Sequence, residues 1–367
     1  MPGGVGDEGS GHHIPALRAL ASGLSRGADL RIFSLAPSPF AGTRGVCGEA
    51  PVEFLGAGGG GAFKAMRLAG AVRRAHHAAP FRLVHGVWAL PAGLAAVAAG
   101  RLLGIPSVVT VQGGEAAALP TLRYGNMLAA RTRIPTLWTC RNAGTLVTVS
   151  RHQAEALAAL GAAPPRTRVI PYGSPHGTPP VQRTGPLPSP LRLLAVANIH
   201  PLKNHETLLR AFALIRRRLP ALLRIAGPDQ RGGELRKLAA ELGVADALSW
   251  AGEVPPAEMP REYAAADMLL HASWHEAQPV VLAEAAAAGL LAAGSRVGLF
   301  ADLSPGAVIA APPGDHEALA AAVVDAAGDP ARVASLRAAL AAWAAEHTME
   351  WTVASYLAIY REHARPR

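Results

Sequence analysis

The chain has 367 residues, of which 50% are hydrophobic and 17% charged, so it predicts about two globular domains and excludes a disordered chain. Its 35 Lys and Arg residues against 26 Asp and Glu residues give a net charge of +9. The two cysteines exclude a disulfide framework and a cysteine zinc site, and no apolar run is long enough for a transmembrane helix.

The positive charge is concentrated in the first half of the sequence. Between residues 54 and 152 the only acid is Glu115, against eleven basic residues. The remainder is nearly neutral, so an anionic partner is expected for the first half. Nucleic acid is the weaker candidate, because the chain has no recognisable reading module and only 5% aromatic residues.

The first half alternates short apolar runs with Ala- and Leu-rich segments, which is typical of a doubly wound parallel sheet. Ser150 is expected to cap the helix that follows it. The predicted strands are 30–35, 52–55, 83–87, 107–111, 145–149 and 168–170, and the predicted helices are 13–24, 62–77, 92–103 and 151–160.

A stretch rich in Pro and Gly separates this half from a second α/β series, so we expect two domains joined by a linker. The second series has predicted strands at 191–197, 222–226, 248–250, 268–271, 290–293 and 308–310, with helices between them and a helical tail. The expected boundaries are an N-terminal domain 1–172, a linker 173–190, a C-terminal domain 191–345, and a final helix 346–367 that returns to the N-terminal domain. Two such sheets predict a ligand-binding cleft at their carboxyl ends.

The most informative segment is SWHEAQPVVLAEAAAAGL, residues 273–290. Pro279 suits the first position of a helix, because it lacks the N–H group that would be unpaired there. The free N–H groups of the next residues, Val280, Val281 and Leu282, would attract phosphate. Glu276 precedes this turn and can contact a sugar, and Glu284 lies within the helix and can accept from ribose hydroxyls. The alternative is a loop glutamate at 276 and a solvated helix glutamate at 284.

A second segment, VANIHPLKNHETLLRA, places a polar loop between a buried strand and a helix. It contains Asn198 and Lys203, and Lys203 is one of three lysines in a chain that otherwise uses arginine. An ammonium group in this loop is suited to a diphosphate. The alternative is a surface lysine, which the dipole at a helix start disfavours.

Together these segments resemble the retaining glycosyltransferases of the GT-B fold, in the large family 4. The motifs in order are the loop ending at Lys203, IAGPDQRGG at 225–233, and HEAQPVVLAEAAAAG with Glu276 and Glu284 eight residues apart. The resemblance implies two Rossmann-like domains and transfer of a sugar from a nucleotide-diphosphate donor with retention of configuration. It also implies that Lys203 binds the diphosphate, Glu276 lies near the donor sugar, and Glu284 holds the ribose.

Several positions depart from that family. Asn198 stands where members often have Arg, and Gln112 where they often have a His near the reacting sugar. Gln112 cannot transfer a proton, although its amide can hydrogen-bond a sugar hydroxyl. Glu115 and His85 are candidates for the acceptor side, and the alternative for Glu115 is a loop acid that neutralises neighbouring arginines.

The N-terminus is the largest departure. Gly3 and Gly4 resemble the Gly-rich turn that follows the family's first strand and contacts the donor, so that strand is expected to be missing. Two explanations stay open: a true start further upstream, or a compromised protein.

The resemblance therefore predicts a cytoplasmic hexosyltransferase that needs no cofactor, and the sequence has no D-x-D triplet for a metal. The acceptor is expected to be a glycan or a lipid-linked hydroxyl compound. Helix 62–77 is predicted either to lie on an anionic membrane or to be an ordinary helix with a basic face. Its residues are Phe63, Met66, Leu68 and Val72 with Lys64, Arg67, Arg73 and Arg74. An alternative function is a non-catalytic protein that binds a sugar nucleotide.

Overall fold

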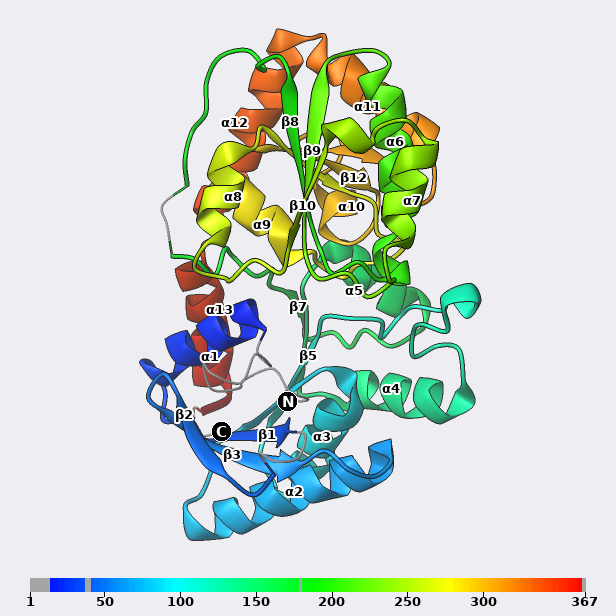
Figure 1. The fold of residues 1–367 in the computed structure, drawn as a ribbon. Helices are drawn as coiled ribbons and strands as arrows, with labels where there is room; N and C mark the ends of the chain where they lie inside the picture. Colours follow the sequence, from blue (N-terminus) through cyan, green and yellow to red (C-terminus); the bar gives the residue numbers. More distant parts are fainter. Residues whose placement is uncertain (1–13, 37–40, 178–179, 365–367) are drawn as a thin grey trace. The chain divides into compact units, whose positions relative to one another are not determined.

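The computed structural model describes residues 14–36, 41–177 and 180–364, which divide into two α/β units (Figure 1). Unit 1 consists of Met1–Pro175 and Met349–Arg367, and unit 2 of His176–Thr348. The boundary lies within the segment 173–190 that the sequence predicts as a linker. The final helix belongs to unit 1.

Unit 2 contains a six-stranded parallel sheet in the order β10-β9-β8-β11-β12-β13. Strands β8 to β10 are added toward one edge of the sheet, and strands β11 to β13 toward the other edge. The topological switch point of this doubly wound fold therefore lies between β8 and β11. Its elements are β8 (Leu191–Val196), α6 (His205–Arg216), β9 (Ala221–Ala226), α7 (Glu234–Glu241), β10 (Leu248–Gly252), α8 (Met259–Ala265), β11 (Met268–His271), α9 (Val280–Ala287), β12 (Leu291–Ser295), α10 (Leu299–Leu303), β13 (Ile309–Ala311), α11 (His316–Ala327) and α12 (Pro330–Glu346).

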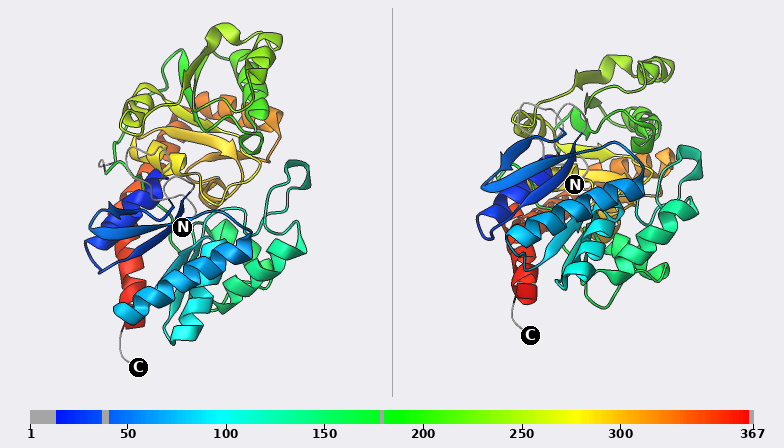
Figure 2. Two further views of the ribbon diagram at one scale, coloured as in Figure 1. Left: turned by 60° about the horizontal axis from the view of Figure 1, so that its bottom comes forward. Right: turned by 90° about the horizontal axis from the view of Figure 1, so that it is seen from below.

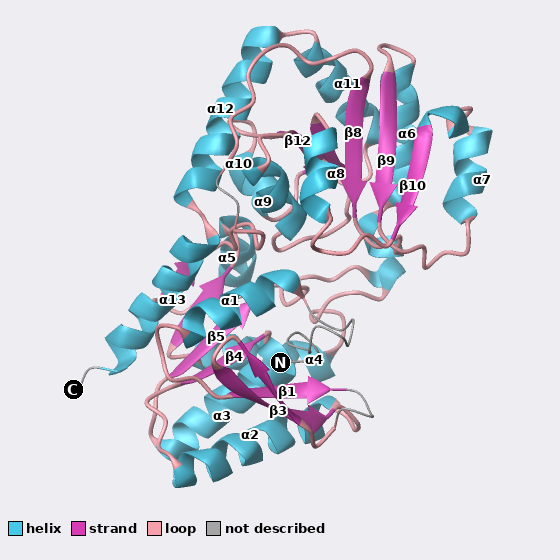
Figure 3. Ribbon diagram, turned by 60° about the vertical axis from the view of Figure 1, so that its left-hand side comes forward, coloured by secondary structure: helices cyan, strands magenta, loops and turns pink. Residues whose placement is uncertain are grey.

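Two apolar layers hold this sheet, one on each face. Successive residues of β8 point to opposite faces, so Leu193 joins the layer under α6 and α11, whereas Leu194 joins the layer under α8 and α9. Figure 3 shows α6 and α7 beside one face of the strands and α8 and α9 beside the other. Because both faces are covered, the strands are apolar runs rather than alternating ones, which explains why the sequence predicts them well.

Unit 1 holds two sheets within the described residues, and this corrects the expectation of one wholly parallel sheet. The order β4-β5-β6-β7 is parallel throughout, whereas in β1-β3-β2 strand β2 runs antiparallel to β3. The elements are α1 (Pro15–Ser25), β1 (Ile32–Ala36), β2 (Arg44–Cys47), β3 (Ala50–Gly56), α2 (Gly61–Ala78), β4 (Val84–Val87), α3 (Leu94–Leu103), β5 (Ser107–Val111), α4 (Ala130–Asn142), β6 (Thr145–Thr148), α5 (Arg151–Ala159), β7 (Thr167–Val169) and α13 (Met349–Ala364).

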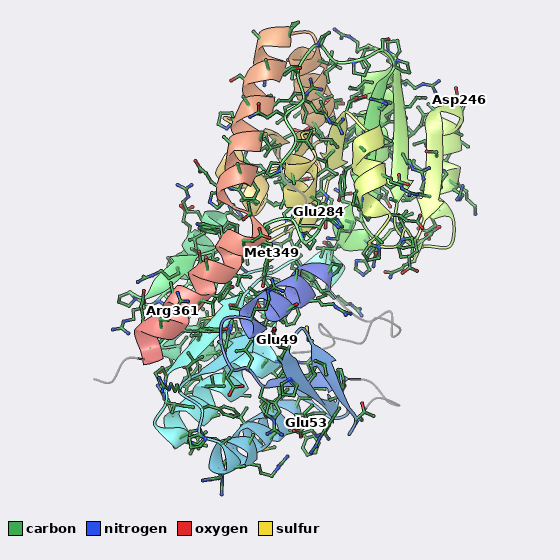
Figure 4. All side chains as sticks on the ribbon, turned by 90° about the vertical axis from the view of Figure 1, so that its left-hand side faces the viewer. Glu49, Glu53, Asp246, Glu284, Met349 and Arg361 are labelled. Atoms are coloured by element: carbon green, nitrogen blue, oxygen red, sulfur yellow. The ribbon has the colours of Figure 1, made fainter. Side chains whose placement is uncertain are left out.

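Strand β2 is missed by the sequence analysis because it is short and largely exposed. It pairs with β3 through a two-residue turn, in which Gly48 has φ +60° and Cys47 lies opposite Ala50. Only glycine adopts this backbone region without strain. Figure 4 marks Glu49 in the turn and Glu53 on β3, where Glu53 pairs with Arg31 at 3.3 Å.

Helix α13 completes unit 1 by packing against α1. A Cβ atom on Gly23 would approach Val353 to 2.4 Å, and one on Gly27 would approach Leu357 to 2.5 Å, so glycine allows the two segments to lie close together. On another side of this unit, α2 runs beside α3 (Figure 2). Ser150 caps α5, as predicted, because its Oγ accepts from the Gln153 N–H at 3.2 Å.

The sequence analysis also misses helix α4. This helix has Pro135 inside it, and two of its three buried residues, Thr136 and Thr139, are polar, so it shows no apolar period. Two predictions concern residues 1–13, which lie outside the described residues: the missing leading strand, and the donor contact of Gly3 and Gly4.

Candidate functional site

The loop after β8 presents Lys203 at the carboxyl end of the unit 2 sheet. Lys203 ends a 3-10 turn (Pro201–Lys203), in which the His200 ring accepts from the Leu202 N–H at 3.2 Å. The next residue, Asn204, has φ +51° and caps α6 by accepting from the Thr207 N–H. The turn and the cap fix the backbone on both sides of the lysine.

The loop after β11 meets this turn directly. Strands β8 and β11 are hydrogen-bonded neighbours, so their carboxyl ends lie side by side. The Trp274 N–H donates to the Leu202 carbonyl oxygen at 2.9 Å, which joins the two loops. The candidate site therefore lies at the switch point, where ligands of such sheets bind.

Three side chains converge on one carboxylate oxygen, Oε1 of Glu276. Lys203 Nζ lies at 2.6 Å, Ser273 Oγ at 2.8 Å and His271 Nε2 at 3.2 Å. His271 Nε2 also contacts Ser273 Oγ at 2.9 Å, and the His271 ring stacks on Phe300. These donors hold Glu276 through Oε1. Among the described residues, no hydrogen-bond donor contacts Oε2.

Glu276 is ionised in this setting. Burial by itself raises the pKa of its carboxyl, but Lys203 and His271 outweigh burial and hold the pKa well below its usual range. Asn198 is exposed on the same loop as Lys203, and its side chain carries no charge.

The start of helix α9 lies four residues after Glu276. Pro279 is the N-cap, with φ −72° and ψ 110°. The helix therefore begins at Val280, one residue later than predicted. The first-turn N–H groups of Val280 and Val281 have no partner within the helix and can face an anion. The prediction for Leu282 is wrong, because its N–H donates to the Pro279 carbonyl oxygen at 3.0 Å.

Glu284, which Figure 4 labels, lies further along α9. Two aromatic side chains contact it. The Tyr263 hydroxyl of α8 donates to its Oε2, and His176 Nε2 lies 3.6 Å from its Oε1. Its side chain is 10% exposed, so the predicted alternative of a solvated glutamate is wrong. Tyr263 hydrogen-bonds only one of the two carboxylate oxygens, which leaves acceptor capacity for a ligand hydroxyl.

Gln112 belongs to unit 1, at the end of β5, where a chain of neutral hydrogen bonds reaches it. The Tyr172 hydroxyl donates to Gln112 Oε1 and is also hydrogen-bonded to Tyr356. Tyr356 in turn contacts Thr110 Oγ1 at 3.0 Å. With Oε1 occupied, the amide nitrogen of Gln112 is the group that can donate to a ligand.

The same chain includes His85, which corrects its predicted acceptor-side role. His85 Nε2 contacts Thr110 Oγ1 at 2.8 Å, and Nδ1 contacts the Tyr360 hydroxyl at 2.6 Å. Burial lowers the pKa of His85 to about 4, so the ring is neutral. Because both ring nitrogens have partners inside unit 1, His85 holds α13 against the sheet.

Glu115 is enclosed by its own loops rather than offered to an acceptor. It is 2% exposed and accepts from the backbone N–H groups of Gly113 at 2.7 Å and Ala89 at 3.3 Å. Burial raises the pKa of Glu115, and these N–H groups oppose that shift. Both expected roles are therefore corrected: the side chain is inaccessible, and no arginine of the described residues forms an ion pair with it.

Sequence reasoning missed four residues of unit 2: His271, Ser273, Tyr263 and His176. The first two had a usable signal, since they lie where a predicted strand ends just before Glu276. The other two reach Glu284 from α8 and from the segment after residue 175, and no spacing in the sequence connects them.

Among the described ranges, no group of three or more His, Cys, Asp or Glu side chains could hold a metal ion. None of the helices in those ranges has the length and apolar character that crossing a membrane requires.

Comparison with known proteins gives matches to both units. Residues 13–173 match the family model "Glycosyl transferase 4-like domain", and residues 190–329 match "Glycosyl transferases group 1". The D-inositol 3-phosphate glycosyltransferase of Acidothermus cellulolyticus is 33% identical over 251 residues, 60% of this chain and 53% of that protein. The chain spans 25% to 53% of the length of the curated relatives it matches.

Solved structures agree on the fold. The sucrose-phosphate synthase of Thermosynechococcus elongatus has a TM-score of 0.76 at 19% identity, covering 94% of this chain and 92% of that one. Anabaena HepE in complex with UDP and glucose has a TM-score of 0.71 at 17% identity, covering 98% of both chains. The fold is therefore GT-B, and with consecutive family matches over both units the chain belongs to the group 1, GT4-type glycosyltransferases.

Proposed function

We propose that the protein transfers a sugar from a nucleotide-diphosphate donor to a hydroxyl acceptor with retention of configuration. The observation that carries the proposal is the convergence of Lys203, His271 and Ser273 on Glu276 Oε1, directly before the start of α9. This arrangement places a cation, free N–H groups and a fixed carboxylate on two loops of one sheet edge.

Each part of this arrangement matches a part of the donor. Lys203 and the N–H groups of Val280 and Val281 would neutralise the diphosphate, which gains charge as it leaves. Glu276 would accept from a sugar hydroxyl through Oε2. Glu284, held by Tyr263, would accept from the ribose hydroxyls.

Retention of configuration rests on the resemblance to family 4 enzymes. Gln112 cannot act as an acid or base, so its proposed contribution is a hydrogen bond from its amide nitrogen to the reacting sugar. The leaving diphosphate would then be the base nearest to the acceptor hydroxyl.

The donor is best identified by a ligand screen on the purified chain. UDP-glucose comes first, because the HepE structures contain UDP and glucose or UDP-glucose. GDP and ADP sugars follow. A donor at 100 times its dissociation constant stabilises the folded state by about 2.7 kcal/mol, which a thermal shift detects. Lys203→Ala should abolish the shift, and Lys237→Ala, an exposed lysine of α7, should leave it unchanged. Equal shifts for both variants would refute the diphosphate assignment.

Turnover separates the enzyme from a non-catalytic nucleotide-sugar protein, the second candidate. That candidate is favoured by the exposed Asn198, which supplies no charge to the diphosphate. Release of UDP from UDP-glucose, with and without acceptor, decides between them. Donor binding with neither transfer nor hydrolysis would support the non-catalytic function.

The acceptor is proposed to be an anionic hydroxyl compound, either lipid-linked or phosphorylated. The basic excess of unit 1 supports this, as do relatives named D-inositol 3-phosphate glycosyltransferases. Myo-inositol phosphate and an anionic glycolipid are the two acceptors to compare.

Helix α2 is the proposed contact with an anionic membrane at the inner face of the cell membrane. Its apolar residues divide into two groups: Leu68 and Val72 are buried in unit 1, whereas Phe63 and Met66 are 50% and 64% exposed. The Arg67 guanidinium stacks on the Phe63 ring at 4.7 Å. Exposed apolar residues beside basic ones are typical of interfacial helices.

Liposome flotation tests this contact. Binding to vesicles with anionic lipid at low salt should exceed binding to neutral vesicles, and the double variant Phe63→Ser, Met66→Ser should remove the difference. Changing Ile134→Ser and Leu102→Ser, exposed on other helices, is the matched control. Equal flotation on both vesicle types would refute the membrane contact and leave donor binding unaffected.

A further inference from the structure

Unit 2 has a pocket away from the Lys203–Glu276 loops, between the segment 180–185 and helix α12. Its volume is about 350 Å³, and Arg337 and Arg183 line it. It lies near Arg192, the second residue of strand β8, and Asp267, the residue before strand β11. The pocket is therefore at the amino-terminal edge of the sheet, opposite the edge where the donor is proposed to bind.

The two arginines of the pocket differ in how they are used. Arg183 donates through all three of its nitrogens to backbone carbonyl groups at the ends of helices α8 and α9. The acceptors are Tyr263, Ala264, Ala266 and Ala288. These are carbonyl groups that a helix end leaves without partners, and a cation there is favourable. Arg183 thus has a complete structural role.

Arg337 has no comparable set of partners. It is 7% exposed, and its Nη1 donates to the Gly185 carbonyl oxygen at 2.9 Å. Its Nε is buried without an acceptor among the described residues. The nearest carboxylate, Asp267, already binds Arg192 through two bonds of 2.8 Å and 2.7 Å. The guanidinium groups of Arg183, Arg192 and Arg337 therefore lie near one carboxylate, that of Asp267.

A buried guanidinium group is normally matched by an anion, because burying an unpaired charge and an unpaired donor is unfavourable. Around Arg337 the described residues supply a single carbonyl oxygen as acceptor. We propose that this pocket binds a small organic anion, with a phosphate or carboxylate group on Arg337 and a compact apolar part along α12.

The apolar part is inferred from the wall of the pocket that α12 forms, on the same helix as Arg337. Beside Arg337 this wall consists of alanines three or four residues apart, among them Ala334, Ala338, Ala341 and Ala345. Alanine leaves room above the helix and offers no hydrogen bond, so this wall suits hydrocarbon. A ligand here would touch the segment that Arg183 fastens to α9, although binding itself does not depend on the proposed function.

The experiment measures binding of inorganic phosphate and n-butyl phosphate by calorimetry. The Lys203→Ala chain serves as the background, because Lys203 is itself a candidate phosphate ligand. Arg337→Gln should weaken phosphate binding at least tenfold, as expected for loss of a charge-assisted hydrogen bond. Arg332→Gln, an exposed arginine of the same helix, is the matched control. Butyl phosphate should bind more tightly than inorganic phosphate.

Equal phosphate affinity for the Arg337→Gln and Arg332→Gln chains would overturn the proposal. If Arg337→Gln does not fold, crystals of the unaltered chain soaked in selenate give an answer without a variant. An anomalous peak within hydrogen-bonding distance of Arg337 Nε is the expected result, and a map without a peak there overturns the proposal. Loss of donor binding in Lys203→Ala with phosphate still bound at Arg337 separates this site from the proposed function.

Discussion

The two units hold their candidate residues by different means. In unit 2 the Lys203–Glu276 ion pair is made at loops that follow two adjacent strands, with His271 and Ser273 beside it. In unit 1, Gln112 is held by uncharged groups that extend through Tyr172 and Tyr356 to helix α13. A charged site can act on a charged ligand directly, whereas a neutral network can only orient an amide. Under the proposed function, unit 2 would supply electrostatic stabilisation and unit 1 would supply positioning.

The largest effect is expected from neutralising the charged site. Glu276→Gln keeps the shape of the side chain but removes the charge that Lys203 and His271 stabilise. Turnover of the donor should fall by about 100-fold or more, as for loss of one preorganised polar group in an active site. Initial-rate kinetics measure it, with Glu241→Gln on the exposed face of α7 as control. An unchanged kcat would mean that unit 2 does not supply the electrostatic part.

Removing the enclosed carboxylate of unit 1 should affect stability rather than charge at a ligand. Glu115→Ala removes the carboxylate that accepts from the buried Ala89 N–H group and the half-buried Gly113 N–H group, so the free energy of unfolding should fall by about 3 kcal/mol. Urea unfolding measures it, and Glu155→Ala on α5, where the side chain is exposed, should change it by less than about 0.5 kcal/mol. A similar loss for both variants would argue against the enclosed carboxylate.

Acid should weaken both units through one histidine in each. Burial lowers the pKa of His85 and of His205 to about 4 from an ordinary value of 6.5. Between these values the unfolded chain binds more protons, so unfolding becomes easier as pH falls from 6.5 to 4, by about 3 kcal/mol per histidine.

The histidine effect can be assigned to each unit by hydrogen exchange at pH 7 and pH 4.5. His85→Gln should reduce the pH dependence of protection in unit 1, and His205→Gln should do so in unit 2. His77→Gln, an exposed position on α2, should reduce neither. Identical pH dependence in all four chains would show that other groups control acid unfolding.

The smallest effect is expected from cutting the neutral network next to Gln112. Tyr172→Phe removes the hydroxyl that fixes the amide, and should lower kcat by about tenfold, which corresponds to about 1.4 kcal/mol, with little change in KM for the donor. Tyr360→Phe makes the same change at the end of the hydrogen-bond network that is farthest from Gln112, next to His85, and should have a smaller effect on kcat. An equal loss in both variants would indicate a general loss of stability instead of positioning of Gln112.

Local patterns predicted much of the fold and of the unit 2 site. The strands of unit 2 are apolar on both faces, and Lys203, Glu276 and Glu284 lie at fixed offsets from those strands, so a single pass along the chain finds them. Strand β2, which is short, and helix α4, whose buried side chains include Thr136 and Thr139, show no apolar period, so no local pattern predicts them. The sequence also does not show which apolar residues of the basic helix 62–77 are buried. The fold buries Leu68 and Val72 and exposes Phe63 and Met66.

The sequence by itself determined most of the strands and helices, the two-domain plan and the residues that end strands β8 and β11, because these depend on side chains a few positions apart. Tertiary structure decided which groups pair: His85 with Tyr360, Glu284 with His176 and Tyr263, and Glu115 with the N–H groups of Gly113 and Ala89. Apart from Gly113, which is two positions from Glu115, these partners lie on different elements, up to 275 positions apart for His85 and Tyr360. Burial gives these pairs their effect, and burial is a property of the packed chain that no spacing along the sequence records.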